Sequence, residues 1–103
     1  MIVYNKLVRD KILKILKLKG VGHKYHIADD KEYQEKLYEK LQEEILEFKE
    51  NPSAEEMADV MEVLNALGRF HNISQRKIGL KMYEKVHERG GFYSRIILES
   101  AEL

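Results

Sequence analysis

Two stretches of this chain carry carboxylates at a spacing that suits metal binding. The first contains Glu43, Glu44 and Glu47, and the second contains Glu56 and Asp59. Residues three or four apart lie on the same face of a helix, so each stretch presents a carboxylate pair if it is helical. Carboxylate oxygens are the ligands that Mg²⁺ and Mn²⁺ prefer in proteins. The chemistry that this pattern indicates is the binding of a hard divalent cation.

The two stretches are also placed symmetrically about a break in the chain. Glu44 and Asp59 are equidistant from the midpoint between residues 51 and 52, beside the one proline, and so are Glu47 and Glu56. A chain that folds back there as two antiparallel helices brings the members of each pair face to face. The sequence therefore predicts one groove lined by two layers of carboxylates.

The alternative is an acidic helix face that is simply solvated. At about 100° per residue, helical phase places Glu44 and Glu56 among the apolar residues of their own helices and Glu47 at the edge of its stripe. No lysine or arginine repeats with the carboxylates on these faces. Anions held so close together need protonation or a neutralising cation. However, Ser53 and Glu56 also form the pattern of a helix capping box. Glu56 as a cap and Glu44 as a surface residue therefore stay the alternative to a metal site.

Apolar periodicity and capping residues predict the helices that position the carboxylates. Residues 6–19 have helical spacing, and further helices are expected from residue 29 or 30 to about 50, from 53 to about 71 and from 74 to about 89. Residues 23–28 and 92–98 could be extended. The predicted fold class is all-α, a bundle of four to five helices with a central antiparallel pair, in a single domain over residues 1–103. The apolar stripe predicted for the first helix of this pair contains Tyr33, Leu37, Leu41, Ile45 and Phe48. The stripe predicted for the second contains Met57, Val60, Met61, Leu64 and Leu67.

Length and composition restrict the class of protein. The chain has 103 residues, of which 35% are charged and 44% hydrophobic, and this is typical of one globular domain. Its 18 basic and 18 acidic residues cancel, which argues against a binder of nucleic-acid polymers or of anionic membranes. It has no cysteine and no apolar run of membrane-spanning length, so we expect a cytoplasmic protein.

The charges are unevenly distributed along the chain. Residues 31–62 carry eleven acidic and four basic side chains, whereas residues 1–30 and 63–103 each carry seven basic side chains against three and four acidic ones. One interpretation is a set of helices with differently charged solvent faces. The other is a carboxylate-rich site beside basic groups, as a metal-dependent enzyme acting on phosphates needs.

The two carboxylate stretches, E-E-x-x-E and E-x-x-D, resemble the motif of the MazG-like all-α NTP pyrophosphohydrolase superfamily. Residues 4–12 (Y-N-K-L-V-R-D-K-I), 58–63 (A-D-V-M-E-V) and 88–92 (E-R-G-G-F) look like a branch similar to phosphoribosyl-ATP pyrophosphohydrolase. The resemblance covers nearly the whole chain. Two features depart from it. Only eight residues separate Glu47 from Glu56, fewer than in many MazG-like proteins, and Leu13 stands where that branch often has proline.

The resemblance implies Mg²⁺-dependent cleavage of a nucleoside triphosphate to a monophosphate and pyrophosphate, as in the house-cleaning of non-canonical nucleotides, with Mn²⁺ as a substitute. Carried over by position, the metal ligands are Glu44, Glu47, Glu56 and Asp59. Either Glu43 or Glu47 would take the proton from the attacking water. The resemblance also implies a homodimer or homotetramer.

Four basic residues are candidates for binding the phosphates of such a substrate, with solvated surface cations as the alternative. They are Lys6, Arg9, Lys81 and Arg89. Two other functions stay open. One is the hydrolysis of phosphoribosyl-ATP, and the other is a catalytically idle helical module that binds a nucleotide or a partner protein. The intact carboxylates favour an enzyme.

Overall fold

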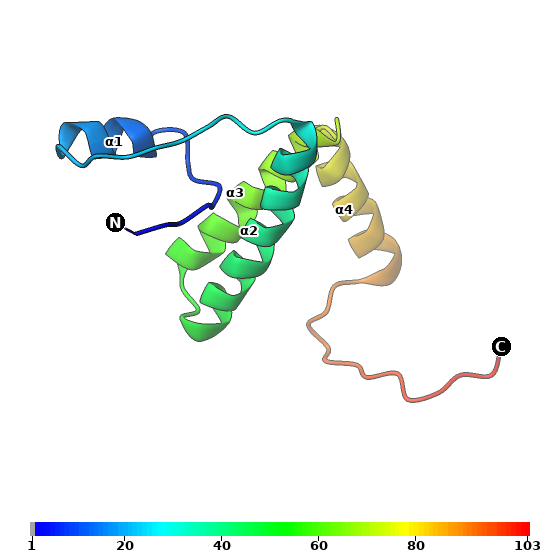
Figure 1. Ribbon diagram of the computed structural model, residues 1–103. Coiled ribbons are helices and arrows are strands. Elements are labelled where there is room, and N and C mark those ends of the chain that lie inside the picture. Colours follow the sequence, from blue (N-terminus) through cyan, green and yellow to red (C-terminus); the bar gives the residue numbers. More distant parts are fainter. Residues whose placement is uncertain (1) are drawn as a thin grey trace. The chain divides into compact units, whose positions relative to one another are not determined.

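All the secondary structure in the part of the chain described by the computed structural model, residues 2–103, is helical (Figure 1). The helices are α1 (Ile12–Leu18), α2 (Asp30–Glu50), α3 (Ala54–Phe70) and α4 (Gln75–Arg89). The chain divides into two compact units, Met1–Asn72 with α1 to α3 and Ile73–Leu103 with α4. The prediction of the all-α class is confirmed. The segments 23–28 and 92–98, which could have been extended, contain no strand.

Polar side chains begin the three longer helices. Asp29, Ser53 and Ser74 each accept a hydrogen bond from the backbone amide three residues further on, at 2.9, 3.2 and 3.1 Å. Such caps satisfy amides that have no partner within the first turn of a helix. The predicted beginnings of α2, α3 and α4 are therefore confirmed.

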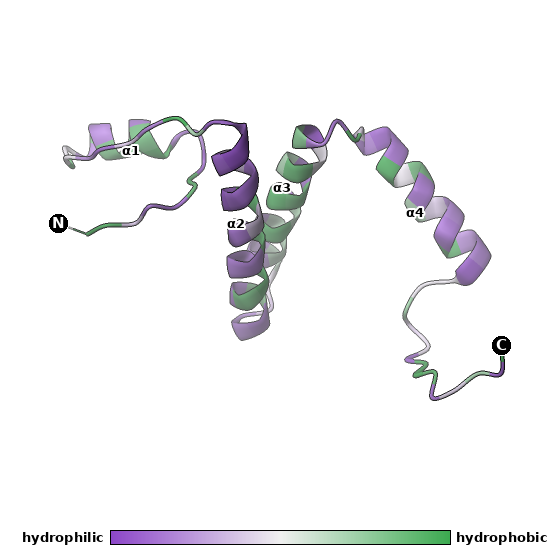
Figure 2. Ribbon diagram, turned by 45° about the vertical axis from the view of Figure 1, so that its right-hand side comes forward, coloured by the Kyte–Doolittle hydropathy of each residue, from purple (hydrophilic) through white to green (hydrophobic). Residues whose placement is uncertain are grey.

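Helices α2 and α3 form a helical hairpin, joined by the short turn at residues 51–53 (Figure 1). Its buried apolar core consists of Leu37 from α2 and of Val63 and Leu67 from α3. Figure 2 shows that hydrophobic residues are more frequent along α3 than along α2. Five partly buried residues pack around this core, namely Leu7, Tyr33, Leu41, Ala66 and Phe70.

The hairpin covers only one stripe of each helix. Met57, Met61 and Leu64 of α3, predicted to be inside, are exposed, and so is Ile45 of α2. The prediction was wrong for these residues because α2 packs on α3 along a single line, which leaves the remaining apolar positions of both helices outside the contact. In this unit the hairpin therefore has an apolar inner seam and a partly apolar outer surface.

The first helix is shorter than the predicted range of residues 6–19. Residues 5–9 are not helical: Asn5 has a φ of 47°, and its carbonyl accepts a hydrogen bond from Lys36 Nζ of α2 at 2.9 Å. At its other end α1 stops as predicted, at Gly20, whose φ is 70°. The amides of Gly20 and Val21 donate to the carbonyls of Lys17 and Leu16 at 3.1 and 3.0 Å, which is the hydrogen-bond pattern of a Schellman motif.

The unit Ile73–Leu103 consists of α4 and the residues that follow it. The amide of Gly90, whose φ is 78°, donates to the carbonyl of Val86 at 2.8 Å and ends the helix. No residue of α4 is buried, and Phe92 and Ile97 beyond it are 97% and 83% exposed. Among the helices of residues 2–103, none combines the length and apolar character needed to span a bilayer.

Leu37 is only 2% exposed, so its replacement tests the hairpin core. We expect Leu37→Ala to lower the free energy of unfolding by about 2 to 5 kcal/mol, because it removes buried methyl groups and leaves a cavity. Urea denaturation at a fixed protein concentration measures this. The matched control is Leu18→Ala at the exposed end of α1, which should change stability by less than about 0.5 kcal/mol. Equal losses in the two variants would contradict the described core.

Candidate metal centre

The hairpin brings all five predicted carboxylates together in two overlapping groups. One oxygen each from Glu44, Glu56 and Asp59 lies within 4.8 Å of the others, and we call these residues the interhelical group. Oxygens of Glu43, Glu44 and Glu47 satisfy the same limit and form the α2 group. Glu44 belongs to both groups. The four predicted ligands therefore do not form one mutually close set, because Glu47 lies with the α2 group.

Glu44 is the most constrained of these carboxylates. It is the one buried charged residue among the described residues, 6% exposed, and its Oε2 atom has no hydrogen-bond partner. The Oε2 atom of Glu56 is likewise buried without a partner. A buried carboxylate oxygen without a partner is costly, because it has lost its hydration and gained nothing in return. A cation bound between α2 and α3 would remove this cost, so the donor set fits a divalent metal.

The surroundings of the interhelical group disfavour the ionised form of two of its carboxyl groups, those of Glu44 and Glu56. Burial, together with the hydrogen bond and charge of Glu47, raises the pKa of Glu44, and the nearby Lys40 only partly offsets this. Burial and the charges of Glu47 and Asp59 likewise raise the pKa of Glu56. Both shifts have the direction expected when like charges are held together in a partly desolvated place.

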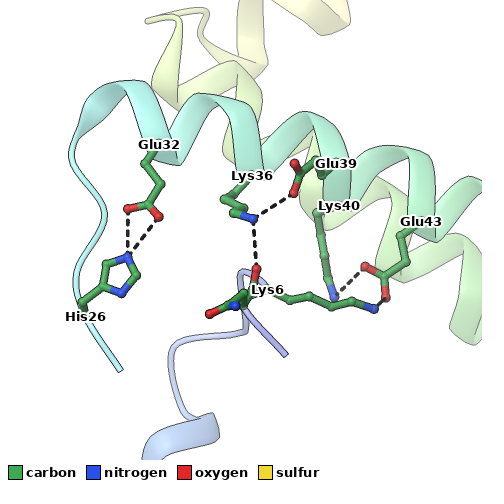
Figure 3. Close-up of polar contacts among 8 residues, drawn as sticks. Lys6, His26, Glu32, Lys36, Glu39, Lys40 and Glu43 are labelled. Carbon is green, nitrogen blue, oxygen red and sulfur yellow. Dashed lines mark hydrogen bonds and ion pairs between the residues drawn. The ribbon is translucent and has the colours of Figure 1, made fainter. Parts of the chain in front are cut away.

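Two lysine side chains lie close to the carboxylates of the α2 group. Lys40 Nζ lies 3.5 Å from Glu43 Oε2, and Lys6 Nζ donates to Glu43 Oε1 at 3.2 Å (Figure 3). Lys40 Nζ also lies 3.5 Å from Glu44 Oε1. Partial burial acts to raise the pKa of Glu43, but Lys6 and Lys40 outweigh it and hold this pKa below its ordinary value. The expectation that no basic residue shares the carboxylate faces was wrong. Lys40 precedes Glu44 by four residues, and this spacing alone was the signal.

The four candidate phosphate-binding residues fall into different units. Lys6 and Arg9 lie with the carboxylates, since Arg9 Nη2 donates to Asp59 Oδ1 at 2.7 Å. Lys81 and Arg89 belong to the unit Ile73–Leu103, where Lys81 Nζ pairs with Glu84 Oε2 at 3.2 Å. Within Met1–Asn72 the structure therefore brings Lys6 and Arg9 to the candidate site.

The capping-box alternative for Glu56 is only half formed. The amide of Glu56 donates to Ser53 Oγ at 3.2 Å, but within residues 2–103 no hydrogen bond joins the Glu56 side chain to the amide of Ser53. The Glu56 side chain lies with Glu44 and Asp59 instead. The alternative that made Glu44 a surface residue is wrong, because Glu44 is buried.

No protein-family model, no curated protein sequence and no solved structure gives a match to this chain. The resemblance to MazG-like pyrophosphohydrolases therefore stays a prediction. What the site offers on its own geometry is a buried, partnerless carboxylate oxygen among further acidic ligands, with cations beside them.

The raised pKa of Glu44 makes a prediction about the metal-free protein. The folded state binds this proton more tightly than the unfolded state, so the stability that Glu44 contributes at low pH is lost as the pH rises from its ordinary pKa of about 4.3 through the raised value. Glu44→Gln carries no such penalty. In the presence of a chelator, its melting temperature relative to the wild type should therefore increase between about pH 4 and pH 7.

The control for this comparison is Glu35→Gln, which changes an exposed glutamate of the same helix. Its melting temperature relative to the wild type should be nearly independent of pH over this range. A Glu44→Gln variant that is less stable than the wild type at pH 7, or whose difference does not change with pH, would contradict the described burial of the charge.

Proposed function

We propose that the protein is a metal-dependent nucleoside triphosphate pyrophosphohydrolase of the cytoplasm, which acts on non-canonical nucleotides. The observation that supports this proposal is the interhelical group, in which the buried Glu44 Oε2 lacks a partner beside Glu56 and Asp59. A structural role leaves this arrangement unexplained, since apolar residues at these positions would pack the seam at less cost. Binding of a cation explains it.

In this proposal Glu44, Glu56 and Asp59 hold Mg²⁺ or Mn²⁺, and Glu47, which lies in the adjacent α2 group, is left free of the metal to act on the attacking water. When bound, the ion supplies neutralisation of phosphate charge and lowers the pKa of the attacking water. Phosphoryl and nucleotidyl transfer depend on positioning and charge neutralisation more than on covalent chemistry, and carboxylates on two packed helices provide a rigid frame for both.

The general base is one of the two predicted residues, Glu43 or Glu47. Glu43 already accepts a hydrogen bond from Lys6 and lies near Lys40, and its lowered pKa makes it the weaker base. Glu47 is exposed and has no ion pair among the described residues. We therefore assign proton removal to Glu47 and an accessory role to Glu43. The oxygen of water attacks the α-phosphorus while Glu47 takes a proton from the water. The bond between the α-phosphorus and the oxygen that bridges it to the β-phosphorus breaks, and pyrophosphate leaves.

Lys6 and Arg9 are the cations next to the carboxylates, and in this proposal they bind the polyphosphate of the substrate. The phosphate-binding role of Lys81 and Arg89, which belong to the unit Ile73–Leu103, stays a prediction. Two competing functions are separated by experiment. Phosphoribosyl-ATP as the one substrate cleaved would indicate the biosynthetic enzyme, and nucleotide binding without turnover would indicate the idle module.

The decisive experiment is a panel of nucleoside triphosphates and phosphoribosyl-ATP, incubated with and without Mg²⁺ and followed by ³¹P NMR. We expect pyrophosphate rather than orthophosphate, formed only when the metal is present. Glu44→Gln and Asp59→Asn should each lower turnover by about 100-fold or more, because each removes a proposed metal ligand. Glu35→Gln should retain wild-type turnover. Full activity of Glu44→Gln would refute the proposed metal centre.

We also propose that the protein assembles as a homodimer or homotetramer. Helix α3 exposes Met57, Met61 and Leu64 on its outer face, and α2 exposes Ile45 and Leu46. Several large apolar side chains exposed on neighbouring helices typically mark an interface between proteins. A second copy of the same chain offers a matching apolar surface through a twofold axis.

Sedimentation equilibrium at micromolar concentration tests this assembly. We expect a mass of two or four times the 12.2 kDa of the chain. Met61→Glu should shift the equilibrium toward the single chain, because it places a charge in the apolar surface. Lys14→Gln on α1, which changes the net charge by the same amount, serves as the control. A wild-type protein that remains a single chain at these concentrations would contradict the assembly.

A further inference from the structure

Residues 5–9 precede α1, have no helical structure and contact the hairpin, and we call them the N-terminal strap. The strap is attached to α2 by the hydrogen bond from Lys36 Nζ to the carbonyl of Asn5, 2.9 Å long (Figure 3). Leu7, in its middle, packs against the buried core of the hairpin. Since the strap and the hairpin belong to the same compact unit, these contacts fix where the side chains on either side of Leu7 can reach.

The two cations of the strap reach one helix each. Lys6 donates to Glu43 of α2 at 3.2 Å, and Figure 3 shows its side chain extended along α2 beside Lys40. Arg9 donates to Asp59 of α3 at 2.7 Å. Leu7 lies between them in the sequence and anchors both. The strap therefore brings a positive charge to the acidic residues of both helices.

The contact of Arg9 differs from that of Lys6, because Asp59 belongs to the interhelical group. Asp59 faces Glu44 and Glu56, whose buried Oε2 atoms have no partner. The Arg9 guanidinium and a divalent cation bound at this group thus compete for the charge of the same carboxylate. The Arg9 side chain is 60% exposed, and exposed ion pairs are weak, so a divalent cation can replace this one.

We propose that Arg9 changes partner during substrate binding, from Asp59 to the polyphosphate of a nucleoside triphosphate that is bound with its divalent cation. The cation takes over the neutralisation of Asp59, and the released guanidinium, still held near the site by Leu7, donates to phosphate oxygens. A planar guanidinium suits this task because it can donate two parallel hydrogen bonds to one phosphate. This inference rests on the proposed metal centre and adds to it a coupling between cation and substrate.

If Arg9 changes partner in this way, one substitution at Arg9 should change the affinities for the cation and for the polyphosphate in opposite directions. Removing the charge of Arg9 removes a competitor for the cation, so the cation should bind more tightly in the absence of substrate. The same change removes a phosphate ligand, so a polyphosphate should bind more weakly. If Arg9 only fastened the strap to α3, its loss would loosen the hairpin and weaken both ligands or neither.

The experiment uses Mn²⁺, followed by electron paramagnetic resonance, and the preformed Mn²⁺ complex of inorganic tripolyphosphate, followed by calorimetry with Mn²⁺-saturated protein. In Arg9→Gln we expect the Kd of Mn²⁺ to fall by about two- to fivefold, the effect of one exposed ion pair. The Kd of the tripolyphosphate complex should rise by about tenfold or more, the effect of a lost charged hydrogen bond. Both readouts are independent of turnover.

Three further variants make the result specific. Arg69→Gln removes an arginine near the far end of α3 and should change neither affinity. Lys6→Gln should leave Mn²⁺ affinity near the wild-type value, because Glu43 lies outside the interhelical group. Arg9→Lys keeps the charge and should also leave Mn²⁺ affinity unchanged, while it binds tripolyphosphate less tightly than the wild type. Melting curves identify any variant that has lost its fold, and Arg9→Lys then carries the test.

Several outcomes would overturn the inference. Unchanged or weaker Mn²⁺ binding in Arg9→Gln, with wild-type Mn²⁺ binding that Glu44→Gln abolishes, would reject the exchange and leave the metal centre standing. Unaltered tripolyphosphate binding in Arg9→Gln, or none in the wild type, would reject Arg9 as a phosphate ligand. Absence of Mn²⁺ binding in the wild type would reject the metal centre and the exchange together.

Discussion

A carboxylate that is removed from water needs either a proton or a cation, and this requirement at Glu44 organises the unit Met1–Asn72. Glu44 lies on the inner side of α2, where the rest of the contact with α3 is apolar. Helix α3 does not relieve the charge but adds Glu56 and Asp59 to it. The basic residues that do relieve it, Lys40 and Arg9, contact only the outer oxygens of the cluster. The two helices thus hold a negative charge that their own side chains neutralise incompletely.

The apolar core that holds these carboxylates in place is small. Three buried residues, Leu37, Val63 and Leu67, form the seam on which the charged cluster depends for its rigidity. The aromatic rings of Tyr33 and Phe70 pack edge to face near one end of it, with centroids 5.6 Å apart. The apolar packing at one end of the helix pair therefore offsets the repulsion between the carboxylates at the other end. Such a balance between a stable scaffold and a destabilising site is common in proteins.

Much of this arrangement was predictable from local rules. The caps at Asp29, Ser53 and Ser74 and the inward direction of Glu44 follow from side-chain chemistry and from a period of 3.6 residues. The non-helical conformation of the strap was not predictable, because residues 6–9 continue the helical spacing of α1, whereas the structure places the strap in contacts with α2 and α3. Periodicity also cannot distinguish a stripe that is covered by a neighbour from one that is not, which explains the exposure of Met57, Met61 and Leu64.

The turn at residues 51–53 has a consequence for how related chains can vary in length. Connections between helices usually tolerate insertions. In the segment between α1 and α2, an insertion would leave the spacing between the carboxylates of α2 and α3 unchanged. Only residues 51–53 join α2 to α3, so an added residue that is taken up by either helix shifts it along its neighbour by about 1.5 Å and rotates it by about 100°, which moves Asp59 away from Glu44. The length of this turn therefore sets how the carboxylates of α2 and α3 align with one another. Drift in length should accumulate elsewhere in the chain, while this turn changes only in steps that restore the helical register.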